Sequence, residues 1–249
     1  MKIFAAILFL ILSLHAIGQR KLKKELYYAF NKDWKSCPID SATYLSYVEV
    51  VNDTTWQWNN YHIWGSLISV ETYKDEQSTI PNGYFSYFNE KGKVDSCGNC
   101  INGLRNGKWL FFVDSLKPQF SRDYVLGKLI KEERSSSRET DNLEPGEKEA
   151  TFPNGTSGWI RYLERYFRYP ERAENKEISG TVYIYFTVNT EGKIESPFIT
   201  KSVEFSIDKE AMRLMYNSPL WIPAEQKGHK VKAYRIQPIM FVYTAASGR

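Results

Sequence analysis

Residues 180–194 read GTVYIYFTVNTEGKI, and this stretch decides the fold of the C-terminal part of the chain. From Val182 to Val188 the even positions are apolar and the odd positions are Thr or Tyr. This alternation predicts a strand with one buried face, because successive side chains of a strand point to opposite sides. Residues 189–192, Asn-Thr-Glu-Gly, favour a turn. A second strand is therefore expected from residue 193 to about residue 201.

Helical patterns lie on both sides of these strands. Apolar residues recur at helical spacing from Trp159 to Phe167, and Pro170 ends that pattern. A second helical stripe follows Ser206, and a last long strand is expected from Lys230 to Tyr243. The order of helix, strand, strand, helix and strand predicts an α+β domain with two helices on one face of a three-stranded antiparallel sheet.

The N-terminal part carries short strand patterns broken by Gly, Asn and Asp. NGYFSYF at residues 82–88 aligns with NGKWLFF at residues 106–112, an offset of 24 residues. A glycine turn followed by a strand with several aromatics is typical of stacked hairpins. We therefore predict an all-β hairpin-repeat domain over residues 19–130. Its second copy resembles MORN-type repeats, which implies an interaction surface.

Residues 131–150 separate the two patterns. They hold a serine triplet, Pro145, Gly146 and many charges, with too few apolar side chains to offset the entropy of ordering. We interpret them as a linker, which places the C-terminal domain at residues 151–249.

The first 18 residues have the features of a signal peptide. Lys2 precedes an apolar run over residues 3–14, and Ala16-Ile17-Gly18 offers small residues for cleavage before Gln19. The run is shorter than the ~20 apolar residues that a bilayer span needs. The expected location is the periplasm, and the alternative is an inner-membrane anchor formed by an uncleaved N-terminus.

Three cysteines occur, at Cys37, Cys97 and Cys100. The last two have the spacing of a redox motif, but the glycines and asparagines around them indicate a turn without a helix to stabilise a thiolate. A disulfide between Cys97 and Cys100 and a pair of idle thiols are both open. A zinc site would need a second pair of ligands at suitable spacing, which the sequence does not offer.

Redox chemistry at Cys97 and Cys100 is the one enzymatic hypothesis that has residues behind it, and no enzyme is predicted. After the leader only His62 and His229 remain, and neither stands in a nucleophile or metal-ligand pattern. No catalytic residue, metal or cofactor is predicted. The net charge of +4 is modest and no block of five like charges occurs, so nucleic acid is not an expected partner.

Six short motifs occur in the C-terminal part, each on the predicted element that suits it. They are YPExA (169–173), GTV (180–182), FxVxxxGKI (186–194), DxEA (208–211), WxP (221–223) and PIxF (238–241). In this order, from about residue 152 to residue 242, they resemble the C-terminal domain of the TonB family.

The resemblance implies that this domain binds a short extended peptide, the TonB box of an outer-membrane receptor, as an added strand. Pro238 independently indicates an edge strand, since it has no N–H to give to a ladder. Lys230 and Lys232 are charges of the kind that protect a strand edge from self-pairing. The residues expected to contact the peptide are Tyr169, Pro170, Lys232, Tyr234, Arg235, Ile236 and Gln237.

The chain departs from the energy transducers of that family at its N-terminus. Those proteins keep an inner-membrane helix in which a Ser and a His, four residues apart, face motor proteins. Here Ser13 and His15 are two apart and cannot share one helix face. We therefore expect a non-enzymatic envelope protein linked to TonB-dependent transport, with inner-membrane motor proteins and homodimerisation left open. The alternative is an envelope scaffold that uses the repeat domain and has no role in transport.

Overall fold

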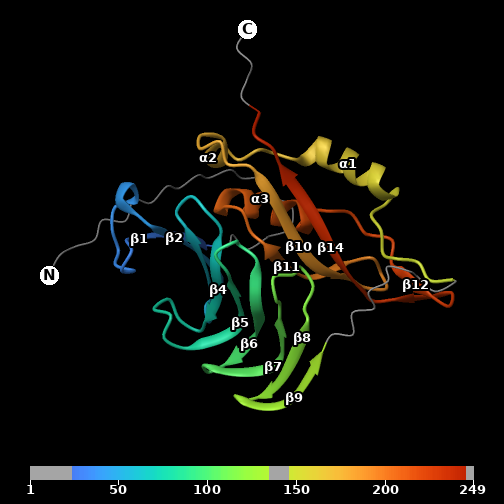
Figure 1. Cartoon of the computed structure of the whole chain (residues 1–249), viewed down its shortest axis with the longest axis horizontal. Helices are drawn as coiled ribbons and strands as arrows, with labels where there is room; N and C mark the ends of the chain where they lie inside the picture. Colours follow the sequence, from blue (N-terminus) through green and yellow to red (C-terminus); the bar gives the residue numbers. More distant parts are fainter. Residues whose placement is uncertain (1–23, 135–145, 245–249) are drawn as a thin grey trace, which may run out of the picture.

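The computed structural model describes residues 24–134 and 146–244. The predicted signal peptide and most of the predicted linker lie outside the described residues. Within residues 24–134, nine antiparallel strands follow one another in sequence order and form one curved sheet, here called the N-terminal sheet (Figure 1). Its strands are β1 (Lys24–Phe30), β2 (Tyr44–Asn52), β3 (Thr55–His62), β4 (Leu67–Tyr73), β5 (Pro81–Phe88), β6 (Val94–Ile101), β7 (Leu104–Phe111), β8 (Phe120–Val125) and β9 (Lys128–Arg134), with a short 3-10 helix at Ile39–Ser41.

The repeat in the sequence has a counterpart in the packing of this sheet. Phe85 on β5 and its equivalent Trp109 on β7 are buried in one cluster. Phe88 packs against a second cluster that contains its equivalent Phe112. Gly98 makes this stacking possible, because a Cβ there would lie 2.4 Å from the ring of Trp109. The N-terminal sheet confirms the predicted all-β class of this part.

Within residues 146–244, three strands form a second sheet in the order β11-β10-β14, here called the C-terminal sheet. The elements are α1 (Gly155–Tyr166), α2 (Glu171–Glu174), β10 (Gly180–Val188), β11 (Ile194–Lys201), α3 (Phe205–Tyr216), β12 (Ala224–Gln226), β13 (His229–Val231) and β14 (Ala233–Phe241). Val182, Ile184, Phe186, Ile239 and Phe241 point to one face and are fully buried under the helices. This confirms the predicted α+β architecture.

The last strand is shorter than predicted. The sequence suggested one strand from Lys230 to Tyr243, whereas β13 ends at Val231 and β14 runs from Ala233 to Phe241. β13 instead pairs with β12 across a turn in which Lys227 and Gly228 have φ of 50° and 80°. The hairpin diverts the first residues of the predicted strand away from the C-terminal sheet.

The described ends of the predicted linker are ordered by pairing. Residues 131–134 belong to β9, where Glu132 forms an ion pair with Arg122 at 2.6 Å. On the other side of the gap, Lys148 and Thr151 make bridges to Glu225 and Ile222. Strand pairing thus reaches into the described residues at both ends of the predicted linker.

The two parts of the chain pack directly against each other. The N-terminal sheet curves around β11 and the start of α3 (Figure 1). Phe205, at the start of α3, contacts the rings of Tyr27, Tyr47 and Tyr61, with centroids 5.4–5.7 Å apart. The ring centroid of Phe198 on β11 lies 6.2 Å from that of Tyr84 on β5. These aromatic contacts hold β11 and α3 on the inner face of the N-terminal sheet.

Candidate peptide-binding edge

β14 is an edge strand in the part of the chain that the structure describes. It pairs with β10 on one side along its whole length, and no described strand pairs with its other side. Pro238 lies in this strand, opposite Tyr183. A proline is tolerated there because the strand has an open side that requires no ladder hydrogen bond. The prediction that Pro238 marks an edge strand is confirmed.

The hydrogen bond of Tyr183 shows which backbone groups of β14 face outward. The hydroxyl of Thr200 on β11 donates to the carbonyl of Tyr183 at 3.2 Å, so the backbone groups of Tyr183 face β11. Tyr183 and Pro238 are therefore a non-hydrogen-bonded pair, in which both residues turn their backbone groups away from each other. Because this orientation alternates along a strand, Tyr234, Ile236 and Met240 present N–H groups to the open edge. Arg235 and Gln237 present theirs to β10.

The side chains of β14 divide by the same alternation. Ile239 and Phe241 are fully buried under the helices, whereas Tyr234 and Met240 are 68% and 66% exposed on the opposite face. Tyr234 stacks on Tyr185 of β10 with ring centroids 5.4 Å apart. The exposed face of the C-terminal sheet therefore carries an aromatic and aliphatic stripe next to the open edge.

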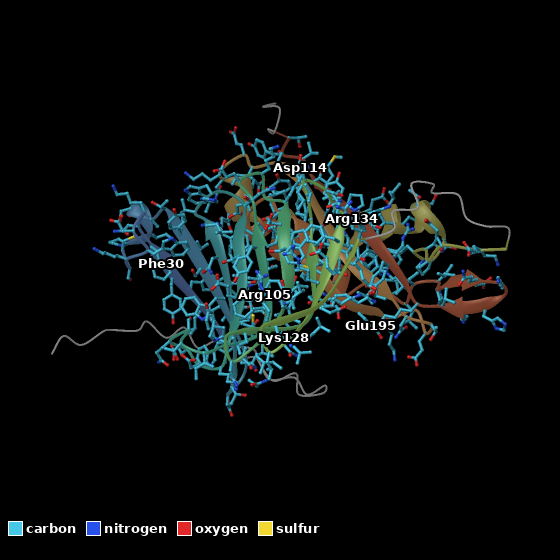
Figure 2. The ribbon with its side chains drawn as sticks, turned by 60° about the horizontal axis from the view of Figure 1, so that its bottom comes forward. Phe30, Arg105, Asp114, Lys128, Arg134 and Glu195 are labelled. Atoms are coloured by element: carbon cyan, nitrogen blue, oxygen red, sulfur yellow. The ribbon has the colours of Figure 1, made fainter. Side chains whose placement is uncertain are left out.

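A groove of about 1860 Å³ runs beside this stripe. Its lining comes from both sheets, with Tyr185, Tyr234 and Ile236 on one side and residues of β7, β8 and β9 on the other. Figure 2 shows Arg134, at the end of β9, next to the strands of the C-terminal sheet. The open edge of β14 therefore faces a cleft between two walls.

Two ion pairs flank the start of β14. Arg235 pairs with Glu149, and Lys232 lies 2.6 Å from Glu195. The hydrogen bond from Lys232 lowers the pKa of Glu195, and the same contact raises the pKa of Lys232. Both groups therefore remain charged at neutral pH. Lys232 is exposed just before β14, where a charged side chain disfavours pairing of this strand edge with another copy of the chain.

The structure does not bring all the predicted contact residues together. Lys232, Tyr234, Arg235, Ile236 and Gln237 follow one another at the start of β14. Tyr169 and Pro170 lie at the other end of the strand. The hydroxyl of Tyr169 donates to the carbonyl of Ile178 at 2.5 Å, and its ring lies 6.1 Å from that of Phe241. Tyr169 thus has a packing role there.

The predicted turn at Cys97 and Cys100 is wrong, because both residues lie within strand β6. They are free thiols in two different clusters, one with Val94 and Phe112 and the other with Phe85 and Trp109. The candidate disulfide between them is therefore not formed. Burial raises the pKa of Cys97 to about 12 and also raises the pKa of Cys100. Both thiols are protonated at neutral pH, as expected of idle thiols.

Sequence reasoning missed the wall that the N-terminal sheet contributes to the groove. Leu110, Ser121 and Glu133 line it. Leu110 lies in the repeat of residues 106–112, whereas Ser121 and Glu133 stand in no motif or repeat. The surroundings of these residues come from strands far away in the sequence. The signal for them appears only once the two sheets are placed side by side.

Comparison with known families agrees with the resemblance. Residues 165–243 match the family model described as Gram-negative bacterial TonB protein C-terminal. The matched span begins near the end of α1 and includes the whole C-terminal sheet. The match supports a TonB-like C-terminal domain over these residues. No curated protein matches the chain. Within residues 24–134 and 146–244, no helix is both long enough and apolar enough to cross a membrane.

Proposed function

We propose that this chain, through its TonB C-terminal domain, binds an extended peptide of an outer-membrane receptor in the periplasm as a fourth strand beside β14. The observation that carries the proposal is the open edge of β14, where alternate backbone groups face a groove. Unpaired N–H and C=O groups of an edge strand are a template for another extended chain. The match of residues 165–243 supports a receptor as the source of that chain.

The opposite edge of the C-terminal sheet is already engaged. The N–H of Ser202, just after β11, donates to the carbonyl of Gly92 at 2.8 Å, and Lys201 forms a bridge with Lys93. These contacts tie the end of β11 to the N-terminal sheet. A peptide that adds to the C-terminal sheet therefore has its longest free template at β14.

The outward groups of β14 define how the peptide would pair. Tyr234 and Ile236 each offer an N–H and a C=O, and Pro238 offers only a C=O. The strongest pairing is therefore expected at the start of the strand, where the side chains of Lys232 and Arg235 also lie. We expect an affinity on the order of micromolar, because ordering an extended peptide offsets much of the contact energy.

The test is calorimetric titration of the mature chain with a panel of N-terminal peptides from outer-membrane receptors of the same cell. Ile236→Pro removes one outward N–H and should abolish binding without disturbing the ladder to β10. Ile236→Val keeps the N–H and serves as the matched control, and circular dichroism checks the fold of both variants. If no receptor peptide binds the wild-type chain at millimolar concentration, the proposal fails and the scaffold alternative replaces it.

A role of this chain in transport is tested separately from peptide binding. A peptide-binding chain released from its leader would act as a docking partner and would need a separate motor protein to supply energy. Deletion of the chain should then impair growth on a nutrient that enters through the bound receptor. A deletion strain with unchanged growth on every receptor-dependent nutrient would separate peptide binding from transport.

A further inference from the structure

We infer that the N-terminal sheet forms the second wall of the peptide site and selects a peptide with a large apolar side chain facing the groove. The inference rests on the proposed function, because it concerns the peptide that pairs with β14. It assigns a role in recognition to a part of the chain outside the matched span of residues 165–243.

The wall is a row of side chains that crosses three strands. Leu110 on β7 lies opposite Ser121 on β8, and Ser121 lies opposite Glu133 on β9. Residues directly opposite one another share a face of an antiparallel sheet. Leu110 packs against the cluster of Val94, Cys97 and Phe112, and Phe198 of β11 packs there too. The row therefore belongs to the inner face, which the C-terminal sheet covers.

The opposite face of the same strands is occupied by other residues. Trp109 and Phe111 alternate with Leu110 and pack in a separate cluster, where the guanidinium of Arg105 lies 4.3 Å from the ring centre of Trp109. Figure 2 shows Arg105 near the middle of the N-terminal sheet. Glu132 alternates with Glu133 and pairs with Arg122 at 2.6 Å. The hairpin of β8 and β9 thus offers one face to the groove and one away from it.

A strand added to β14 would place every second side chain over this groove. Side chains of neighbouring strands that lie directly opposite are ~4.5–5.5 Å apart at Cβ and share a face. Half of the peptide side chains would therefore stand beside Tyr234 and Ile236 and point toward Leu110 and Ser121. The small side chain of Ser121 leaves space in the wall.

The residues beside β14 in the groove favour an apolar side chain of the peptide. Leu110 on one side and Tyr185, Tyr234 and Ile236 on the other side give the groove an apolar part. Charged side chains also line the groove, and six of them form ion pairs with one another: Lys108 with Glu133, Lys148 with Glu225, and Arg235 with Glu149. Burial of apolar area stabilises a complex by about 25 cal/mol per Å². A Leu, Ile, Phe or Tyr side chain of the peptide gains most from this environment.

The occupant is a peptide rather than a second copy of this chain. In a symmetric antiparallel pair of two β14 strands, each copy would bring its own Pro238 and the ladder would lose two donors. A ladder between β14 and a receptor peptide contains Pro238 only once and therefore loses only one donor. Tyr234 and Ile236 line the groove and also present backbone groups to the open edge, so one extended segment would contact both.

The test uses substitutions that narrow the groove and leave the sequence of β14 unchanged. Ser121→Trp in the mature chain places a large ring between the two walls and should weaken binding of the receptor peptide by on the order of tenfold or more. Glu133→Trp should act similarly from the neighbouring strand. Glu132→Trp is the matched control, because it adds the same ring to the opposite face of the hairpin. Thermal unfolding of all three variants checks their folds.

A second arm identifies the side chain that the groove receives. Alanine replacements are made one at a time along the peptide and titrated against wild type and Ser121→Trp. At every second peptide position, replacement by alanine should weaken binding to the wild-type chain and should change binding to Ser121→Trp little. The two sets of affinities form a double-mutant cycle between the peptide side chain and the wall.

The outcomes separate this inference from the proposed function. If both groove-filling variants bind like wild type while Ile236→Pro does not bind, the second wall is refuted and strand addition stands. If wild type binds no receptor peptide, both fail. If sedimentation shows a wild-type dimer that Ile236→Pro dissociates and that excludes the peptide, a second copy occupies the edge and the inference is overturned.

Discussion

The guanidinium of Arg172 lies 2.6 Å from the fully buried carboxylate of Glu204. Arg172 belongs to α2, directly after the Tyr-Pro motif, and Glu204 caps α3 by accepting from the N–H of Ser206 at 2.8 Å. The same guanidinium donates to the carbonyl of Ile63 and lies 4.0 Å from the ring centre of Trp64. One side chain thus joins α2, α3 and the β3–β4 turn.

Arg172→Met should destabilise the protein by about 3 kcal/mol, because it leaves the buried charge of Glu204 unpaired. Urea unfolding measures the change in free energy. Lys193→Met is the control, since its partner Glu191 is an exposed residue 2.6 Å away and exposed pairs contribute little to stability. Equal losses in the two variants would show that the buried pair has no special role.

Asp208 should make stability fall as pH rises through the weakly acidic range. Its carboxyl is fully buried, and burial raises its pKa to about 7 although it accepts from Ser202 and from the N–H of Val203. The groups that face it are Tyr61, Ser202 and the charged Glu204.

Proton binding to Asp208 determines whether the free energy of unfolding rises or falls with pH. Between the unfolded value near ~4 and the folded value near 7, the folded state holds the proton and the unfolded state has lost it. This group therefore contributes a slope of up to about −1.4 kcal/mol per pH unit in that window and none above it. Asp208→Asn should remove this contribution. Free energies of unfolding for both proteins from pH 4 to pH 8 check it, and parallel curves would contradict it.

Cys37 should react with iodoacetamide under native conditions well before Cys97 and Cys100. Cys37 is half-exposed, whereas the other two thiols are buried and have raised pKa values, so few thiolates form there. Mass spectrometry after timed alkylation measures the order. Cys97→Ser with Cys100→Ser should leave peptide affinity unchanged. Insulin reduction by wild type that this double variant lacks would establish the redox role that burial argues against.

The protein isolated from its own envelope should begin near Gln19. The prediction rests on the apolar run and the small residues before that position. Intact-mass measurement of the soluble and membrane fractions provides the answer. A chain that retains Met1 in the membrane fraction would show an anchor and would bring inner-membrane motor proteins back as direct partners.

Local sequence determined the order of elements in the C-terminal part. Strand alternation and helical spacing depend only on residues a few positions apart, and both predicted helices and the β10–β11 pair are present as α1, α3 and a hairpin. Pro238 also placed β14 at an edge, because the missing N–H is a property of the residue itself. The six motifs identified the domain for the same reason, since each is short and contiguous.

Tertiary structure decided which backbone groups of β14 face the open edge and what stands opposite them. The direction of a backbone N–H depends on the register of β14 against β10, and a shift of one residue reverses it for every position. Only that register shows that Ile236, rather than Arg235 or Gln237, turns its N–H outward. The proposed second wall depends on contacts such as that of Arg172 with Ile63, 109 residues away, which join α2 to the β3–β4 turn of the N-terminal sheet. Chain-distant packing of this kind leaves no local pattern, because each partner needs only to fit the surface that the other presents.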